Sequence, residues 1–136
     1  MESKSLQISI NHTYYIRGKK YDNIIWFIPV STKIEKYKKV YDTKIQKQIK
    51  LGKNPSVDTI VFGDIANTYS AFLIQNMFPV TLKYIDHIHT KNGNPVPVNK
   101  KLQGIIKKNT KSLIAISERG VKVTFTDIIR LRNKLI

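Results

Sequence analysis

Two hydroxyl groups and an ammonium group follow one another at Ser31, Thr32 and Lys33, between a predicted strand and a predicted helix. RNA carries its own nucleophile, the 2′-hydroxyl beside each phosphate, so cutting it requires only acid–base groups and positive charge. A helix N-terminus adds backbone N–H groups and a positive dipole, which suit a phosphate. The simpler interpretation is that Ser31 or Thr32 only caps the helix.

His12 and Tyr14 are two further candidates for chemistry. Residues Thr13–Arg17 read as a strand, in which one of Tyr14 and Tyr15 should face inward and the other outward. An exposed tyrosine beside basic groups is a natural surface for base stacking. The competing interpretations are a structural tyrosine and an ordinary surface histidine, which are the commoner cases.

Other kinds of site find little support in the residues. The 9 acidic residues are dispersed, without the clustered carboxylates of a two-metal nuclease. Cysteine is absent, and His87 and His89 have no third ligand nearby for zinc. The glycines form no phosphate-binding loop. We therefore expect neither a metal nor a cofactor.

The charge of the chain predicts a polyanionic partner. Its 24 lysines and arginines outnumber the acids and give a formal net charge of +15. The segment Lys33–Lys53 holds eight lysines against Glu35 and Asp42. Such a run is often only a solvated face, but acids elsewhere are too few to neutralise it. We expect RNA to contact Arg17, Lys19, Lys20, Lys36, Tyr37, Lys38, Lys39, Lys47 and Lys50.

A membrane explains the charge less well. The longest apolar stretch, Ile24–Val30, is too short to span a bilayer. A surface-bound helix would need the apolar stripe of Ile34–Lys50, which the core also needs. Residues Met1–Ile10 lack the apolar region of a signal peptide. We expect a cytoplasmic protein without membrane contact.

The pattern of apolar residues predicts one α+β domain over residues 1–136. Ile34, Tyr37, Tyr41, Ile45 and Ile49 fall on one face of a helix. Pro29 should mark a strand end or an edge, and Pro79 should end a strand. Strands are predicted at Thr13–Arg17, Ile24–Val30, Thr59–Phe62, Ala71–Phe78 and Val121–Phe125, with a polar turn around Asn67. Further helices are predicted after Asn99, with Leu102, Ile105, Ile106 and Leu113 inward, and from a Thr126 cap to Leu135.

Three ordered segments resemble a known family of proteins. They are Ile25–Tyr37 (IWFIPVSTKIEKY), Asp58–Gly63 (DTIVFG) and Phe72–Ile85 (FLIQNMFPVTLKYI). Together they resemble the toxins of type III toxin–antitoxin systems, the CptN, ToxN and AbiQ endoribonucleases, and the CptN type most closely. The likeness runs from about His12 to the end of the chain.

The resemblance implies a fold and a function. The fold is a small antiparallel SH3-like (PemK/MazF-like) barrel with added helices. The activity is metal-independent, sequence-specific cleavage of target mRNA that leaves a 2′,3′-cyclic phosphate and serves phage defence by abortive infection. The inhibitor is a pseudoknot antitoxin RNA, and toxin and RNA form a closed protein–RNA hetero-oligomer.

The same resemblance assigns roles to residues. Ser31 and Thr32 match the hydroxyl pair of the family, with Thr32 replacing a serine. The catalytic lysine corresponds to Lys33 or Lys36, and we assign Lys33 to catalysis and Lys36 to phosphate binding. His12 and Tyr14 fall in the polar and aromatic segment that in this family precedes the first β-hairpin. The segment before His12 is shorter than is usual for the family. The alternative is a non-catalytic basic RNA- or DNA-binding module.

Overall fold

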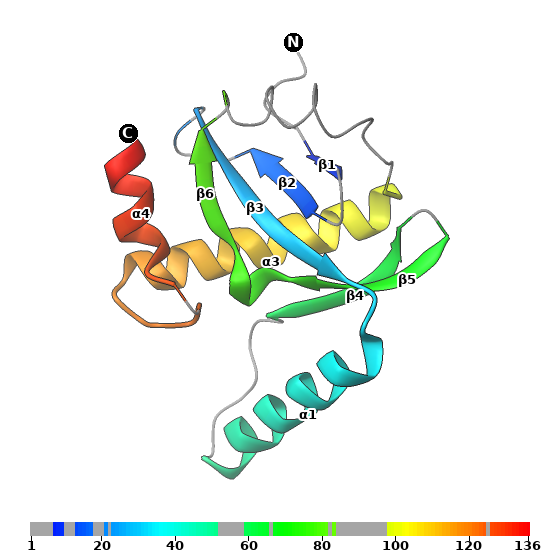
Figure 1. Ribbon diagram of the computed structural model, residues 1–136. Helices are drawn as coiled ribbons and strands as arrows, with labels where there is room; N and C mark the ends of the chain where they lie inside the picture. Colours follow the sequence, from blue (N-terminus) through cyan, green and yellow to red (C-terminus); the bar gives the residue numbers. More distant parts are fainter. Residues whose placement is uncertain are drawn as a thin grey trace.

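The computed structural model describes residues 7–9, 13–17, 21, 23–51, 59–65, 67–81, 83, 98–124 and 126–136. The strands are β1 (Gln7–Ser9), β2 (Thr13–Arg17), β3 (Ile24–Ser31), β4 (Ile60–Ile65), β5 (Thr68–Leu73) and β6 (Phe78–Thr81). The helices are α1 (Ile34–Lys50), α3 (Lys100–Glu118) and α4 (Ile128–Leu135), with a 3-10 turn, η2 (Ile74–Asn76). Figure 1 shows the strands as one twisted sheet with helices around it.

Strand β3 holds the sheet together, because it pairs along its whole length. The strand order is β1-β2-β3-β5-β4, and every pairing is antiparallel. On the side away from β2, the first half of β3 pairs with β6, as far as Phe27 opposite Phe78. The end of β3 pairs with β5, starting at Val30 opposite Phe72. Pro29 pairs with Thr13 of β2 and falls between the β6 and β5 pairings on the other side of β3. It therefore sits inside a central strand and not at the predicted strand end.

The predicted strand Ala71–Phe78 is two strands joined by η2. The Gln75 amide donates to the Thr59 carbonyl at 3.0 Å, and the Met77 amide donates to the Ile74 carbonyl at 3.0 Å. This turn shifts the chain from the β5 position to the β6 position along β3. Pro79 lies inside β6, opposite Trp26, and β6 pairs with β3 alone among the described strands. The nearly continuous apolar character of Ala71–Phe78 favoured a single strand, although its two polar residues, Gln75 and Asn76, lie in the turn.

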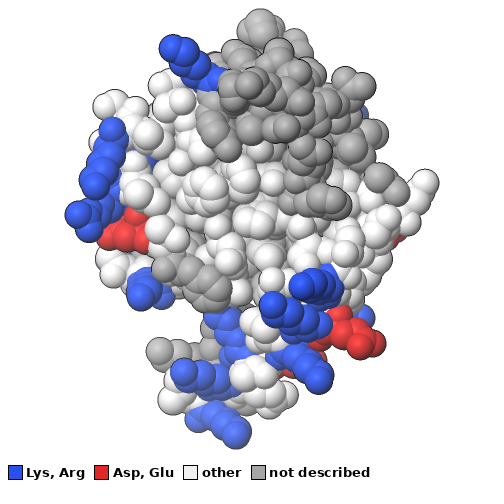
Figure 2. All heavy atoms as spheres, in the orientation of Figure 1, with Lys and Arg blue, Asp and Glu red and all other residues white. Residues whose placement is uncertain are grey.

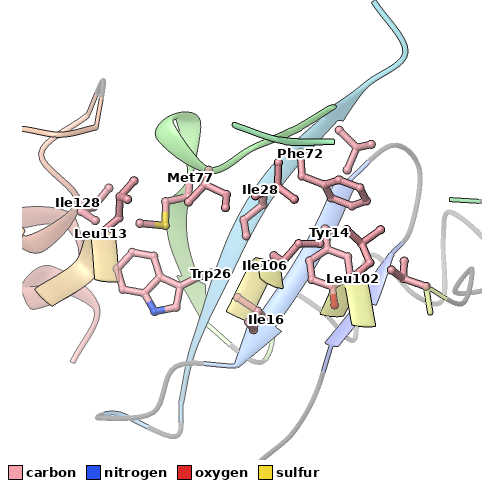
Figure 3. Close-up of a cluster of buried hydrophobic side chains, with 14 of the residues drawn as sticks. Tyr14, Ile16, Trp26, Ile28, Phe72, Met77, Leu102, Ile106, Leu113 and Ile128 are labelled. Atoms are coloured by element: carbon pink, nitrogen blue, oxygen red, sulfur yellow. The ribbon is translucent and has the colours of Figure 1, made fainter. Parts of the chain in front are cut away.

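The main core lies between one face of the sheet and helix α3 (Figure 3). Tyr14 and Trp26 enter it from β2 and β3, and Leu102 and Ile106 enter from α3. Asn99 caps α3 as predicted, because its side-chain oxygen accepts from the Leu102 amide at 2.8 Å. This core fixes β3 and so fixes the strand end from which Ser31 projects.

Helix α1 packs on the opposite face of the β4–β5 hairpin. Ile34, Tyr37 and Tyr41 contact a second cluster formed by the buried residues Ile60, Ala71 and Leu73. Val61 and Phe72, their neighbours in sequence, belong to the α3 side. Because strand side chains alternate between faces, α1 and α3 lie on opposite sides of this hairpin. Figure 1 shows α1 projecting from the rest of the domain.

Several predictions about the fold need correction. The mixed α and β class with an antiparallel sheet is confirmed, but the described sheet is open: its path ends at β1 and β4. Residues 121–124 form no strand, and Phe125 lies outside the described residues. Asp127, not Thr126, caps α4, since its carboxylate accepts from the Arg130 amide at 3.1 Å. Ile105 is 40% exposed and points away from the core.

Helix α4 is held by an ion pair as well as by the core. Ile128 is buried in the main core. Arg132, which is also buried, donates to Glu118 of α3 at 2.8 Å and lies 4.9 Å from the centre of the Tyr21 ring. Within the part of the chain that the structure describes, no helix is both long enough and apolar enough to cross a membrane.

Candidate nucleic-acid interface

The predicted hydroxyl cluster forms the corner between β3 and α1. The strand ends at Ser31 and the helix begins at Ile34. The Lys33 amide donates to Ser31 Oγ at 3.1 Å, and the Tyr37 amide donates to the Lys33 carbonyl at 3.3 Å. Lys33 therefore occupies the N-cap position that was predicted for Ser31 or Thr32. Ser31 Oγ accepts one bond in this turn, which leaves its O–H hydrogen able to turn toward a ligand.

The corner is open to solvent and continues into a basic helix face. Thr32 and Lys33 are exposed, and Ser31 is half-buried. The five α1 lysines predicted to contact RNA are all exposed: Lys36, Lys38, Lys39, Lys47 and Lys50. Among the described residues, no carboxylate lies within 4 Å of their ammonium groups. Figure 2 shows basic side chains gathered over the projecting α1, where all of them are lysines.

Tyr37 was predicted to contact RNA, but its ring packs against the sheet. Its ring is half-buried on the inner stripe of α1, against the second cluster. The Lys36 ammonium lies 5.3 Å from the centre of that ring. Such a contact orients the lysine side chain at the surface. Tyr37 therefore positions a cation near the corner.

Lys44 is an α1 lysine that sequence reasoning left out of the site. Its ammonium donates to Thr59 Oγ1 at 3.2 Å and to Gln75 Oε1 at 3.4 Å. Thr59 and Gln75 are buried and uncharged, and burial lowers the pKa of Lys44. These bonds tie the second half of α1 to the start of β4 and to η2. Lys44 therefore acts as a structural tether between the basic helix and the sheet.

Tyr14 does not lie at the candidate site. Both Tyr14 and Tyr15 are buried, with 0% and 2% of their surfaces exposed, so the predicted exposed partner is missing. The Tyr14 ring packs edge-on against Phe72 at 5.6 Å in the main core. Burial also raises the pKa of its phenol, which keeps it protonated at neutral pH. Tyr15 is covered because the second face of β2 is packed too, as its edge contact with Phe27 at 5.1 Å illustrates.

Arg17 lies at the other end of the sheet from the corner. It pairs with Ile25, six residues before Ser31 along β3, which corresponds to about 20 Å of strand. The side chain is half-buried. Three other predicted site residues, His12, Lys19 and Lys20, lie outside the described residues.

Helix α3 carries a second basic surface that the sequence analysis did not single out. It has five lysines against Glu118, and α1 has six lysines against two acids, so the excess is four on each. Lys100, Lys101, Lys107, Lys108 and Lys111 are all exposed. A count of lysines over residues 100–118 could have found this surface, although the run between Lys33 and Lys53 is denser. The two helices place this charge on opposite sides of the β4–β5 hairpin.

Tyr69 is a second residue that the sequence analysis missed. The turn around Asn67 was correct, and Asn67 adopts a φ of 64°. However, β5 begins at Thr68, opposite Ile65, so Tyr69 is a strand residue and not part of the turn. The residue is 48% exposed. The alternation of Tyr69, Ala71 and Leu73 on one face was the signal that could have placed it.

Metal binding finds no geometric support in the described part of the chain. No group of three or more histidine or carboxylate side chains gathers there, and His87 and His89 lie outside it. The chain matches no protein-family model, and no curated protein matches its sequence. The corner and the two basic helices are therefore the features that bear on function.

Proposed function

We propose that this protein is a metal-independent endoribonuclease, the toxin of a type III toxin–antitoxin system. The observation that carries the proposal is the Ser31–Thr32–Lys33 corner, which presents hydroxyl and ammonium groups beside the exposed lysines of α1. The resemblance to the CptN, ToxN and AbiQ toxins supports the same residues. The SH3-like barrel of that family remains part of the proposal.

In the proposed reaction the RNA supplies the nucleophile. A base removes the proton of the 2′-hydroxyl, and this oxygen attacks the adjacent phosphorus. The bond to the 5′-oxygen breaks, the leaving oxygen takes up a proton, and a 2′,3′-cyclic phosphate remains. Lys33 and Lys36 stabilise the added negative charge, and the Ser31 and Thr32 hydroxyls hold the phosphate oxygens.

The two basic helices support the proposed RNA partners. Because α1 and α3 lie on opposite sides of the β4–β5 hairpin, one protein can contact RNA on two sides. Target mRNA binds at α1, next to the corner. A pseudoknot antitoxin RNA that also reaches α3 can join neighbouring proteins into a closed protein–RNA assembly. Release of the toxin from it provides phage defence by abortive infection in the cytoplasm.

A non-catalytic RNA- or DNA-binding module is the second candidate. The burial of Tyr14 favours it, because this removes one predicted catalytic group from the corner. The charge of α3, which belongs to no catalytic feature, favours it as well.

Cleavage in EDTA separates the two candidates. Protein freed of RNA should cut A-rich single-stranded RNA in EDTA. Ser31→Ala should lower the cleavage rate about 100-fold or more, while Ser31→Thr, which keeps the hydroxyl, should retain most of it. Loss of cutting in EDTA, or full activity of Ser31→Ala, would contradict the proposed mechanism. Binding without any cutting would favour the non-catalytic module.

A further inference from the structure

An exposed aromatic ring lies beside the corner, on the same face of the sheet. Ser31 pairs directly with Ala71 across the β3–β5 ladder. Tyr69 lies two residues from Ala71 on β5, so all three side chains share the face that α1 covers. Such a diagonal pair of residues lies about 7–8 Å apart, which places Tyr69 close to Ser31.

The Tyr69 ring is held in place from two sides. It stacks on Phe62 of β4, with ring centres 6.2 Å apart and planes 18° apart. Phe62 is in turn packed edge-on by Tyr41 of α1 at 6.2 Å. The Lys38 ammonium lies 5.7 Å from the centre of the Tyr69 ring. An aromatic ring held in this way loses little freedom when a ligand stacks on it.

The surroundings of Tyr69 suit a polyanion. A base that stacks on the ring brings its phosphates toward Lys38 and the other exposed α1 lysines. Asp64 pairs directly with Tyr69 across the β4–β5 ladder and shares its face. Its negative charge disfavours phosphate on that side, so the RNA-binding surface ends there. A protein partner would gain less from this site, because lysines are depleted in the cores of protein–protein interfaces.

We propose that Tyr69 is a stacking platform for one base of single-stranded RNA, next to the nucleotide whose phosphate sits at Ser31. This assignment rests on the proposed function for the position of that phosphate. Tyr69 binds and positions substrate and takes no part in proton transfer. The exposed Lys38 side chain gives up its place over the ring to the base and contacts the phosphate of the stacked nucleotide.

The test is equilibrium binding of a short single-stranded RNA to variants in the Ser31→Ala background, which keeps the RNA intact. Tyr69→Ala should weaken binding by about fivefold to 100-fold. Tyr69→Phe should bind within about twofold of the parent, and Tyr69→Leu, which keeps apolar volume without an aromatic face, should bind like Tyr69→Ala. Val121→Ala, which truncates an exposed apolar residue away from α1, is the matched control and should bind like the parent.

A second readout follows stacking itself. RNA that carries 2-aminopurine at successive positions should show fluorescence quenching at one position, and Tyr69→Ala should abolish it. If Tyr69→Ala binds as tightly as the parent, or if Tyr69→Leu binds as well as Tyr69→Phe, the stacking proposal is wrong even if the protein cuts RNA. If stacking is observed and the protein with Ser31 intact cuts nothing, the stacking proposal stands and the endoribonuclease proposal fails.

Discussion

The ammonium group of Lys38 lies 5.7 Å from the centre of the Tyr69 ring, so helix α1 and strand β5 meet at a cation–π contact. Both residues are exposed, and both lie beside the corner at which β3 turns into α1. A surface that combines cations, an aromatic face and hydroxyl groups fits single-stranded RNA.

The α1 lysines should bind short single-stranded RNA more strongly than the α3 lysines do. Changing Lys36, Lys39 and Lys47 to Gln removes three phosphate contacts. The slope of log affinity against log salt should then fall in magnitude by about 2, because each contact with a single strand contributes about 0.7. Binding of a short RNA at several salt concentrations, measured by fluorescence anisotropy, gives this slope.

The matched control removes the same charge from the other face. Lys101, Lys107 and Lys108 of α3 are also exposed, and their change to Gln should leave the slope for a short RNA nearly unchanged. Equal loss from both triple variants would mean that net charge, and not the α1 surface, determines binding.

Replacing Gly63 with alanine should loosen the packing of α3 on the sheet. A Cβ at this position would lie 2.5 Å from Leu102 Cδ2 and 3.1 Å from its Cγ, and Leu102 is buried in the main core. We expect a loss of about 1–3 kcal/mol in the free energy of unfolding, measured with urea. Gly104 lies in α3, the helix that holds Leu102, and a Cβ there would meet open space. Gly104→Ala should therefore stabilise the protein by about 0.5–1 kcal/mol. A neutral Gly63→Ala would contradict the described α3 packing.

The burial of Lys44 should appear in the pH dependence of stability. Its pKa is lowered in the folded protein. Between that pKa and the unfolded value of about 10.4, the unfolded chain therefore holds more protons than the folded protein does. The free energy of unfolding of the parent, minus that of Lys44→Met, should therefore increase from neutral pH to about pH 10. Urea unfolding of both proteins at the two pH values measures this difference.

An exposed lysine one turn away controls for general effects of charge removal. Lys47→Met removes the same charge from the same helix without burial, and its difference from the parent should hardly change with pH. A flat difference for Lys44→Met as well would mean that its ammonium is hydrated, and that it does not tether α1.

Local patterns predicted the elements that form the candidate site. The 3.6-residue repeat placed the start of α1 at Ile34, and the predicted strands Thr13–Arg17 and Ile24–Val30 correspond to β2 and to most of β3. The partners of these elements were not predictable in the same way. The pairing of Ser31 with Ala71, which brings Tyr69 to the corner, depends on the η2 turn. In the apolar stretch Ala71–Phe78, only Gln75 and Asn76 mark that turn.

Burial was the other property that the sequence did not reveal. Tyr14 and Tyr15 point to opposite faces of β2, and alternation alone predicted one exposed ring. Because the sheet is covered on both faces at this strand, both rings are buried. The reverse holds for Ile105, which fits the helical stripe but is exposed at its edge. Position on an element was thus predictable, whereas coverage by other elements was not.

The most direct test of the central claim measures cleavage of two RNA strands that have the same sequence. One strand is unmodified, and the other carries 2′-O-methyl groups in place of its 2′-hydroxyls. If the RNA supplies the nucleophile, the protein in EDTA should bind both strands and cut only the unmodified one. The upstream fragment should carry a 2′,3′-cyclic phosphate, identified by mass spectrometry. Cutting of the 2′-O-methyl strand, or upstream fragments that end in a free 3′-hydroxyl, would contradict attack by the 2′-hydroxyl and with it the proposed function of the Ser31–Thr32–Lys33 corner.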